Sequence, residues 1–143
     1  MDSILRRIKR ILNAKGQSLV EFALILPILL LLILGIFEFG RAFYMKNTLT
    51  NAVRHAARTA VVNVAWNQNI VRQWTYSSVP TSWRSAAVIK SVQVTPTAPP
   101  ASGSGASVTV TARVKFNTIV PHFAFPYKNY TTIAARASMR YEQ

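Results

Sequence analysis

No cysteine occurs among the 143 residues of this chain, and glycine occurs only five times. Without cysteine the chain can have neither a disulfide framework nor a thiolate metal site. The glycines do not suggest a phosphate-binding loop, because Gly103 and Gly105 lie in a stretch rich in proline and serine that is typical of a flexible turn.

Acidic residues are almost as scarce. The four acids are Asp2, Glu21, Glu38 and Glu142. Hydrolytic carboxylate pairs, carboxylate metal clusters and Ser-His-Asp triads all need acidic side chains that this chain lacks. The two histidines, His55 and His122, are far apart and have no metal-ligand spacing. We therefore expect no enzymatic activity, no cofactor and no metal, and structural or surface roles for both histidines.

Basic residues dominate the charge, with 17 lysines and arginines and a formal net charge of +13. Residues 1–16 hold five of these basic residues and one acid, so their removal would lower the formal charge from +13 to +9. Such a charge favours acidic surfaces, anionic lipid or nucleic acid in general, and it identifies none of them as the partner.

A long apolar run follows the basic N-terminal segment. Between Leu19 and Phe39 the only charged residues are Glu21 and Glu38. At about 1.5 Å per residue these 21 positions reach about 31 Å, close to the ~30 Å hydrocarbon core of a bilayer. The basic cluster before the run predicts a single-pass protein with its N-terminus in the cytoplasm. A secretory signal peptide is the alternative, but the run is unusually long and no small-x-small cleavage site follows Phe37.

Two residues stand out within this run. Glu21 lies near the N-terminal end of the run, five residues after Gly16 and directly before Phe22. A charge in lipid is costly, so Glu21 is a functional candidate. Pro27 interrupts the run, and a proline inside a helix removes one backbone hydrogen bond and kinks the chain. It is either an ordinary transmembrane proline or a soft point at which the helix bends in use.

Helical spacing continues beyond the apolar run. Small and apolar residues recur at three- and four-residue steps at Ala42, Met45, Leu49, Ala52, Val53, Ala56 and Ala60. This spacing predicts one helix from about Ser18 to about Val62. Its ladder of small residues lets another backbone approach closely, and we favour a sheet of the same chain over a neighbouring helix.

The period changes from helical to alternating in the C-terminal half. We expect a short helix near Asn69–Thr75 and strands near Val88–Val94, Val108–Phe116 and Asn129–Tyr141. In the first strand, Val88, Lys90, Val92 and Val94 are expected on one face. The sequence thus predicts an α+β fold, in which a long N-terminal transmembrane helix (17–62, membrane segment about 19–39) continues into a small antiparallel β-sheet domain (63–143).

Aromatic and basic side chains alternate in the stretch before the first strand. They are Trp66, Arg72, Trp74, Tyr76, Trp83 and Arg84. This pattern suits single-stranded nucleic acid, a membrane-proximal aromatic belt, or packing inside the protein. Packing or subunit contact is the favoured interpretation, and nucleic acid is not expected as a partner.

The stretch from Lys15 to Ala60 resembles the TadE-like family of minor pilins or pseudopilins of type IVb (Flp, tight-adherence) pili. Four segments carry the resemblance: Gly16 with Glu21-Phe22, the apolar segment Phe22–Pro27, the polar exit Glu38–Arg41, and the arginine-alanine segment Asn51–Ala60. Ala57 departs from the pattern, since glycine is often expected at that position.

The resemblance implies that residues 1–16 are a prepilin leader. A prepilin peptidase would cut between Gly16 and Gln17 and methylate the new amine. Glu21 would pair with the N-terminal amine of a neighbouring subunit. In an apolar bundle this pairing offsets the cost of burying two charges only in the correct register. The alternative is that Glu21 extends to the lipid headgroups.

The resemblance also implies a function. The expected protein is a pilin-like subunit that acts in assembly or initiation of type IVb pili for adhesion, located in the bacterial inner membrane and, after assembly, in the pilus. Its expected partners are the prepilin peptidase, other pilin or pseudopilin subunits, the inner-membrane assembly platform and membrane lipid. The alternatives are a pilus-tip protein that binds DNA or a surface through its basic body, or an uncleaved single-pass membrane protein.

Overall fold

The computed structural model describes the backbone of residues 2–63, 65–85, 88–99, 105–119 and 130–141, with side chains from Gly16 onward except that of Tyr130. Its first helix, α1 (Asp2–Val62), runs through two compact units, residues 1–38 and 39–143. We refer to these as the N-terminal unit and the body, and each is described by itself.

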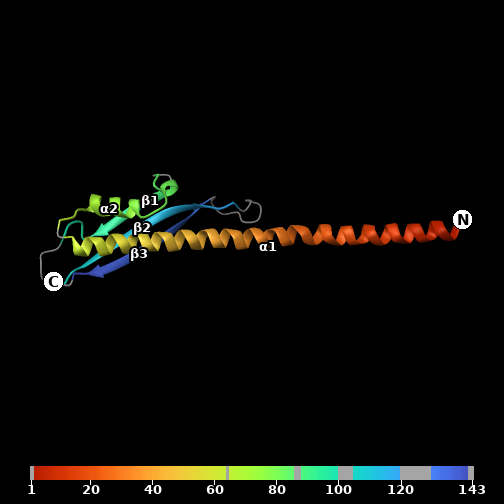
Figure 1. Ribbon diagram of the computed structural model, residues 1–143, viewed down its shortest axis with the longest axis horizontal. Helices are drawn as coiled ribbons and strands as arrows, with labels where there is room; N and C mark the ends of the chain where they lie inside the picture. Colours follow the sequence, from red (N-terminus) through yellow and green to blue (C-terminus); the bar gives the residue numbers. More distant parts are fainter. Residues whose placement is uncertain (1, 64, 86–87, 100–104, 120–129, 142–143) are drawn as a thin grey trace. The chain divides into compact units, whose positions relative to one another are not determined.

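The body combines the second part of α1 with a short helix and a three-stranded sheet (Figure 1). After α1 the elements are α2 (Gln68–Ser77), the 3-10 turn η1 (Thr81–Trp83), β1 (Ile89–Thr95), β2 (Ser107–Asn117) and β3 (Tyr130–Arg140). The strands are antiparallel and follow the order β1-β2-β3, which is a meander. The predicted α+β fold, with a long apolar N-terminal helix before a small antiparallel sheet, is confirmed.

The helix α1 begins earlier than its sequence pattern predicted. Its expected start was near Ser18, whereas the helix begins at Asp2; its end at Val62 is as predicted. Residues 3–15 contain neither glycine nor proline and include two leucines, one alanine and five basic residues, which favour helix. Gly16 costs only about 1 kcal/mol relative to alanine inside a helix, so one glycine does not end it.

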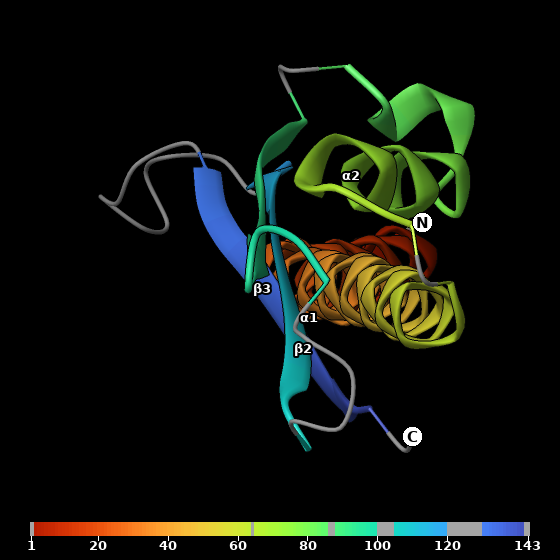
Figure 2. The ribbon, with the colours of Figure 1, turned by 90° about the vertical axis from the view of Figure 1, so that its left-hand side faces the viewer.

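Alternation along β2 decides which side of the sheet is buried. Its residues from Val108 to Phe116 are buried at every second position. Both α1 and α2 lie on one side of the sheet (Figure 2). The side chains of α1 in the core are at most 1 % exposed and comprise Leu49, Ala52, Val53, Ala56, Ala57 and Ala60. They form one hydrophobic cluster with the inward residues of the strands, so the alanine ladder packs within the chain.

The first strand departs from the predicted alternation. Lys90 was expected on the same face as Val92 and Val94, but it is exposed, and Ile89 is buried with the two valines instead. The register with β2 shifts directly after Ile89. A β-bulge of this kind inserts one extra residue into a strand, which keeps the apolar residues inward and turns the charged one to solvent. The expectation for Lys90 was therefore wrong.

The short helix α2 confirms the helix predicted near Asn69–Thr75. It begins after Asn67, whose side-chain oxygen accepts hydrogen bonds from the backbone N–H groups of Asn69 and Ile70, each at 3.0 Å. An asparagine at this position satisfies donors that the first helical turn leaves unpaired. The cap fixes where the chain turns from α1 into α2.

Basic side chains reach both outer strands of the sheet. From α1, the ammonium group of Lys46 donates to the backbone carbonyl of Ala134 in β3. From α2, Nε of Arg72 donates to the carbonyl of Val92 in β1 at 3.0 Å. Each of these bonds occupies a carbonyl group on an outer strand, where unpaired backbone groups otherwise invite a further strand.

Tyr141 links the end of the last strand to the end of α1. Its hydroxyl accepts a hydrogen bond from Nε1 of Trp66 at 2.6 Å and donates one to the carbonyl oxygen of Ala60 at 3.1 Å. Trp66 itself is only 4 % exposed. One hydroxyl group therefore satisfies two polar groups at the end of the core.

Replacing Tyr141 with phenylalanine should lower the free energy of unfolding of the body by about 1–3 kcal/mol, because the buried indole N–H of Trp66 and the carbonyl of Ala60 would lose their partner. Thermal unfolding followed by tryptophan fluorescence measures this loss. Tyr44→Phe is the matched control, since the Tyr44 side chain is exposed and the same change there should cost less than about 0.5 kcal/mol. Equal melting of the two variants would contradict the role given to Tyr141.

Candidate functional site at the start of the apolar span

The segment from Gly16 to Phe22 lies entirely within α1, so the peptide bond between Gly16 and Gln17 is helical. A side-chain carbon placed on Gly16 would meet no described atom within 4 Å. No described side chain therefore fills the space beside Gly16. Glycine has the lowest helix propensity of the residues in this segment, which favours local opening of the helix at this point.

Glu21 follows Gln17 by one helical turn. Nε2 of Gln17 donates a hydrogen bond to Oε1 of Glu21 at 3.4 Å, and no other described residue bonds this carboxylate. Helical side chains lean toward the N-terminus, so the Glu21 carboxylate lies over the turn that begins at Gln17. The second acid of the run differs, because Glu38 is only 8 % exposed and takes part in an interaction.

A cut after Gly16 would change the charge around Glu21. The shortened helix would begin at Gln17 with a new amine and with four backbone N–H groups that have no helical partner. Such a helix end carries roughly half a positive charge in addition to the amine. The Glu21 carboxylate already leans toward that turn, so either its own amine or that of a neighbouring chain could pair with it.

The apolar side chains that follow Glu21 are exposed. The most apolar stretch of α1 is 0 % buried, and the helix is long and apolar enough to cross a membrane. A core helix of a soluble protein would instead be covered by protein. Phe22, placed next to Glu21, is 58 % exposed, and several residues of the run exceed two thirds: Leu19 69 %, Leu24 70 %, Ile28 68 % and Phe39 71 %.

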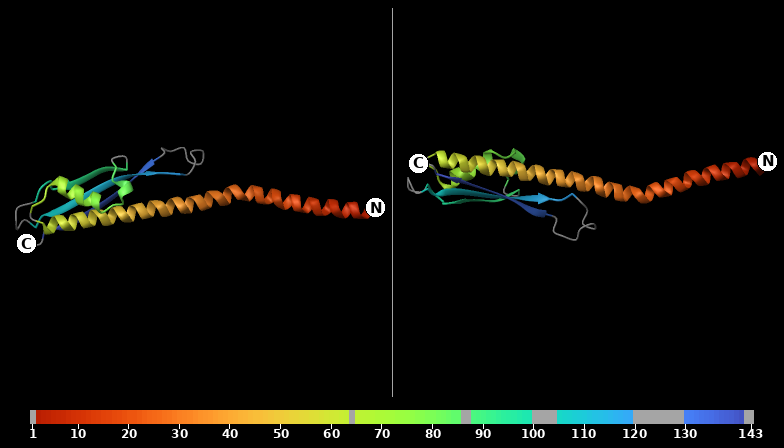
Figure 3. Two further views of the ribbon diagram at one scale, coloured as in Figure 1. Left: turned by 45° about the horizontal axis from the view of Figure 1, so that its top comes forward. Right: turned by 90° about the horizontal axis from the view of Figure 1, so that it is seen from below.

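Pro27 lies inside α1 without ending it. Figure 3 shows a bend in the orange part of the helix, within the N-terminal unit. Proline has no N–H group and its ring displaces the preceding turn, which is the usual cause of a sharp bend in a helix. The bend fits an ordinary transmembrane proline and a functional soft point equally well.

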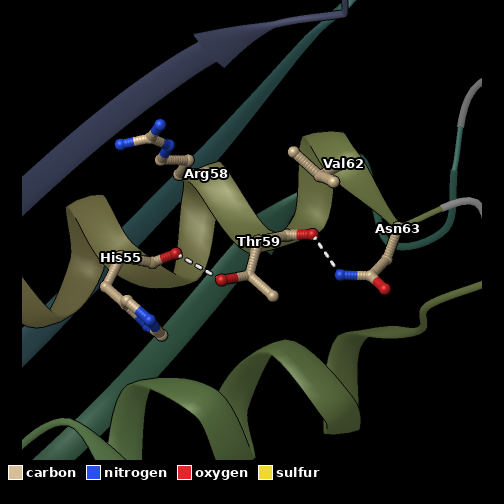
Figure 4. A pocket seen from close by; sticks show the side chains of 5 residues that line it. All are labelled: His55, Arg58, Thr59, Val62 and Asn63. Carbon is tan, nitrogen blue, oxygen red and sulfur yellow. Dashed lines mark hydrogen bonds between the residues drawn. The ribbon is translucent and has the colours of Figure 1, made fainter.

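A shallow hollow near the C-terminal end of α1 offers no catalytic arrangement. It has a volume of about 380 Å³ and is lined by His55, Arg58, Thr59, Val62 and Asn63 (Figure 4). The hydroxyl of Thr59 donates to the carbonyl of His55 at 2.9 Å, and the amide of Asn63 donates to the carbonyl of Thr59 at 2.7 Å. Nδ1 of His55 lies 3.3 Å from the Ser78 hydroxyl, but that hydroxyl also bonds the carbonyl of Trp74 at 2.8 Å.

None of the described residues that line this hollow is acidic, so among them the histidine has no carboxylate partner of the kind that a catalytic triad needs. The other histidine, His122, lies outside the described residues. Within the described part of the chain no three His, Cys, Asp or Glu side chains gather as metal ligands do.

The aromatic and basic residues between positions 66 and 84 are used inside the body. Trp66 is buried, and both Arg72 and Arg84 donate hydrogen bonds to backbone carbonyl groups. The half-buried aromatic side chains that pack against the core are Trp74, Tyr76 and Trp83. These contacts are those of aromatic side chains that pack inside a protein, so the geometry favours packing.

Comparison with known proteins agrees with the resemblance seen in the sequence. The model of the TadE-like protein family matches residues 16–58. That range begins at Gly16, includes Glu21 and Pro27, and extends into the part of α1 that packs on the sheet. No curated protein and no solved structure gives a significant match to the chain. The predicted resemblance is thus confirmed over the matched residues.

Proposed function

We propose that this chain is a minor pilin or pseudopilin that assists or initiates assembly of a type IVb pilus. Residues 16–58 match the TadE-like family, which indicates a Tad pilus-associated protein of the minor-pilin type. The observation that carries the proposal is the exposed apolar part of α1, with the Glu21 carboxylate at its start. A side-chain carboxylate in that position is costly unless a partner charge meets it.

In this proposal the protein passes once through the inner membrane. The basic residues before the apolar run hold the N-terminus in the cytoplasm, and the body lies on the opposite side. The apolar part of α1 first contacts lipid and later contacts the helices of other pilin subunits. The inner-membrane assembly platform moves the subunit from the first environment to the second.

We further propose that the chain is the substrate of a reaction and catalyses none. The prepilin peptidase cuts after Gly16, releases residues 1–16 and methylates the amine of Gln17. The scarcity of acids in the sequence, four in 143 residues, supports a structural role. Adhesion would follow from assembly of the pilus.

The N-terminal mass of the protein isolated from cells tests this proposal. We expect a chain that starts at Gln17, with or without one added methyl group. Replacing Gly16 with leucine should leave the chain starting at Met1, because the bulky side chain would occupy the position next to the cut. Ser18→Ala is the control and should be processed normally. A wild-type chain that starts at Met1 would favour the uncleaved single-pass alternative and overturn the proposal.

A further inference from the structure

One side of the sheet faces away from α1 and α2 (Figure 2). Apart from Ala134, the described side chains on that side are polar. We call it the polar sheet face. Its side chains are those of serine, threonine, glutamine, asparagine and one alanine, together with the cations Arg113, Lys115, Arg136 and Arg140. The exposed Lys90 lies beside them at the bulge, between Ile89 and Ser91. None of the described side chains of the face is acidic, and its one aromatic residue is Tyr130, which pairs with Asn117 at one end of the strands. Charge on this face is therefore of one sign.

Three cations of the face, Arg113, Arg136 and Arg140, are exposed and form no hydrogen bond or ion pair with a described residue. The guanidinium of Arg140 lies over Gly105. Arg113 and Arg136 lie together in the middle of the strands. In the register of β2 with β3, Arg113 is opposite Ala134 and Arg136 is opposite Thr111. The two arginines thus occupy diagonal positions on neighbouring strands, where Cβ atoms are about 7–8 Å apart.

Two like charges at such a spacing disfavour each other, and an anion held between them would offset the repulsion. Guanidinium groups suit this role because each presents a planar fork of donors that matches a carboxylate. The pair can therefore act as one anion-binding unit on this face.

Hydroxyl and amide groups surround this pair. The hydroxyl of Thr109 bonds that of Ser138 across the strands at 3.0 Å, and Gln93 lies level with Thr111 and Arg136 in the register. Such groups both donate and accept hydrogen bonds, as sugar hydroxyls do. Tyr130 is six residues along β3 from Arg136, so no described side chain beside the arginine pair is an aromatic ring on which nucleic-acid bases could stack.

We propose that the polar sheet face binds an acidic polysaccharide. Arg113 and Arg136 hold one carboxylate of the polymer, and the surrounding hydroxyl and amide side chains bond its hydroxyl groups. The other cations of the face, Lys115 and Arg140, attract neighbouring carboxylates. This inference goes beyond the proposed role in pilus assembly and does not depend on it, since the face is the same with or without residues 1–16.

The test uses the full chain in nanodiscs of zwitterionic phosphatidylcholine and a fluorescent oligogalacturonate as the probe. We expect binding at low salt that weakens as salt is added, because salt screens exposed charges. The double variant Arg113→Ser, Arg136→Ser should lose roughly tenfold or more in affinity, through the loss of charge-assisted bonds. The matched control is the double variant Arg54→Ser, Arg58→Ser, which removes the same charge from exposed positions on α1. Its affinity for the probe should fall less than about threefold.

Four results would overturn the proposal. They are no binding by the wild-type chain, equal losses in the two double variants, equal binding of neutral dextran, and tighter binding of duplex DNA than of oligogalacturonate at the same salt concentration. All four substituted arginines are exposed, so both variants should melt close to the wild-type temperature, and the comparison then reports on binding.

Discussion

Replacing Glu21 with alanine should leave membrane insertion intact and reduce pilus assembly by roughly a hundredfold or more. In the proposed assembly the methylated amine of Gln17 enters an apolar bundle of helices and needs a carboxylate partner there. Removing one member of a buried ion pair typically costs about 3–5 kcal/mol, and about 1.4 kcal/mol corresponds to a factor of ten. Quantifying pili on cells, with the amount of membrane-bound subunit measured in parallel, checks this result.

Gln17→Ala is the informative control for that experiment. It removes the side chain that donates to Glu21 at 3.4 Å but keeps the backbone amine that processing would create. Nearly normal assembly of this variant would show that the Glu21 carboxylate acts through the amine. Normal piliation with Glu21→Ala would instead leave headgroup contact as the better account of the residue.

Replacing Leu49 with alanine should strongly destabilise the body. Leu49 is fully buried, in the part of α1 that packs in the core, so its truncation leaves a cavity that typically costs about 2–5 kcal/mol. For a domain of this size the melting temperature should fall by roughly 10 °C or more. Tryptophan fluorescence reports on this unit alone, because Trp66, Trp74 and Trp83 all lie in the body.

Val62→Ala provides the comparison for the Leu49 variant. Val62 also belongs to α1, but it is 73 % exposed, so its truncation should change the stability by about 0.5 kcal/mol or less. A Leu49→Ala protein that melts within a few degrees of wild type would show that this part of α1 contributes little to the core.

The elements that could be predicted from the sequence are those with a local pattern. The spacing of Leu49, Ala52, Val53 and Ala56 marks a helix face in any context, and the alternation from Val108 to Phe116 marks a half-buried strand. The candidate site was found in the same way, since a carboxylate in an apolar run is visible in the sequence itself.

Features that depend on distant partners could not be predicted. The bulge at Lys90 follows from pairing with β2, because register is a property of two strands. The role of Trp66 depends on Tyr141, which is 75 positions later in the chain. The extent of α1 before Ser18 was not predicted for another reason. The resemblance implied that residues 1–16 are a leader that is cut away, although their composition also favours a helix.

In the proposed assembly, subunits would lie side by side in one membrane, and the cations at the two outer strands would then affect how these subunits meet. Copies with the same orientation that met edge to edge would bring β3 of one against β1 of the next, and with them Lys46 against Arg72. Mutual repulsion would oppose that contact, and a carbonyl group on each outer strand is already occupied. Aggregation through the sheets would thereby be disfavoured, and in the proposed assembly the apolar helix would be the part through which copies associate.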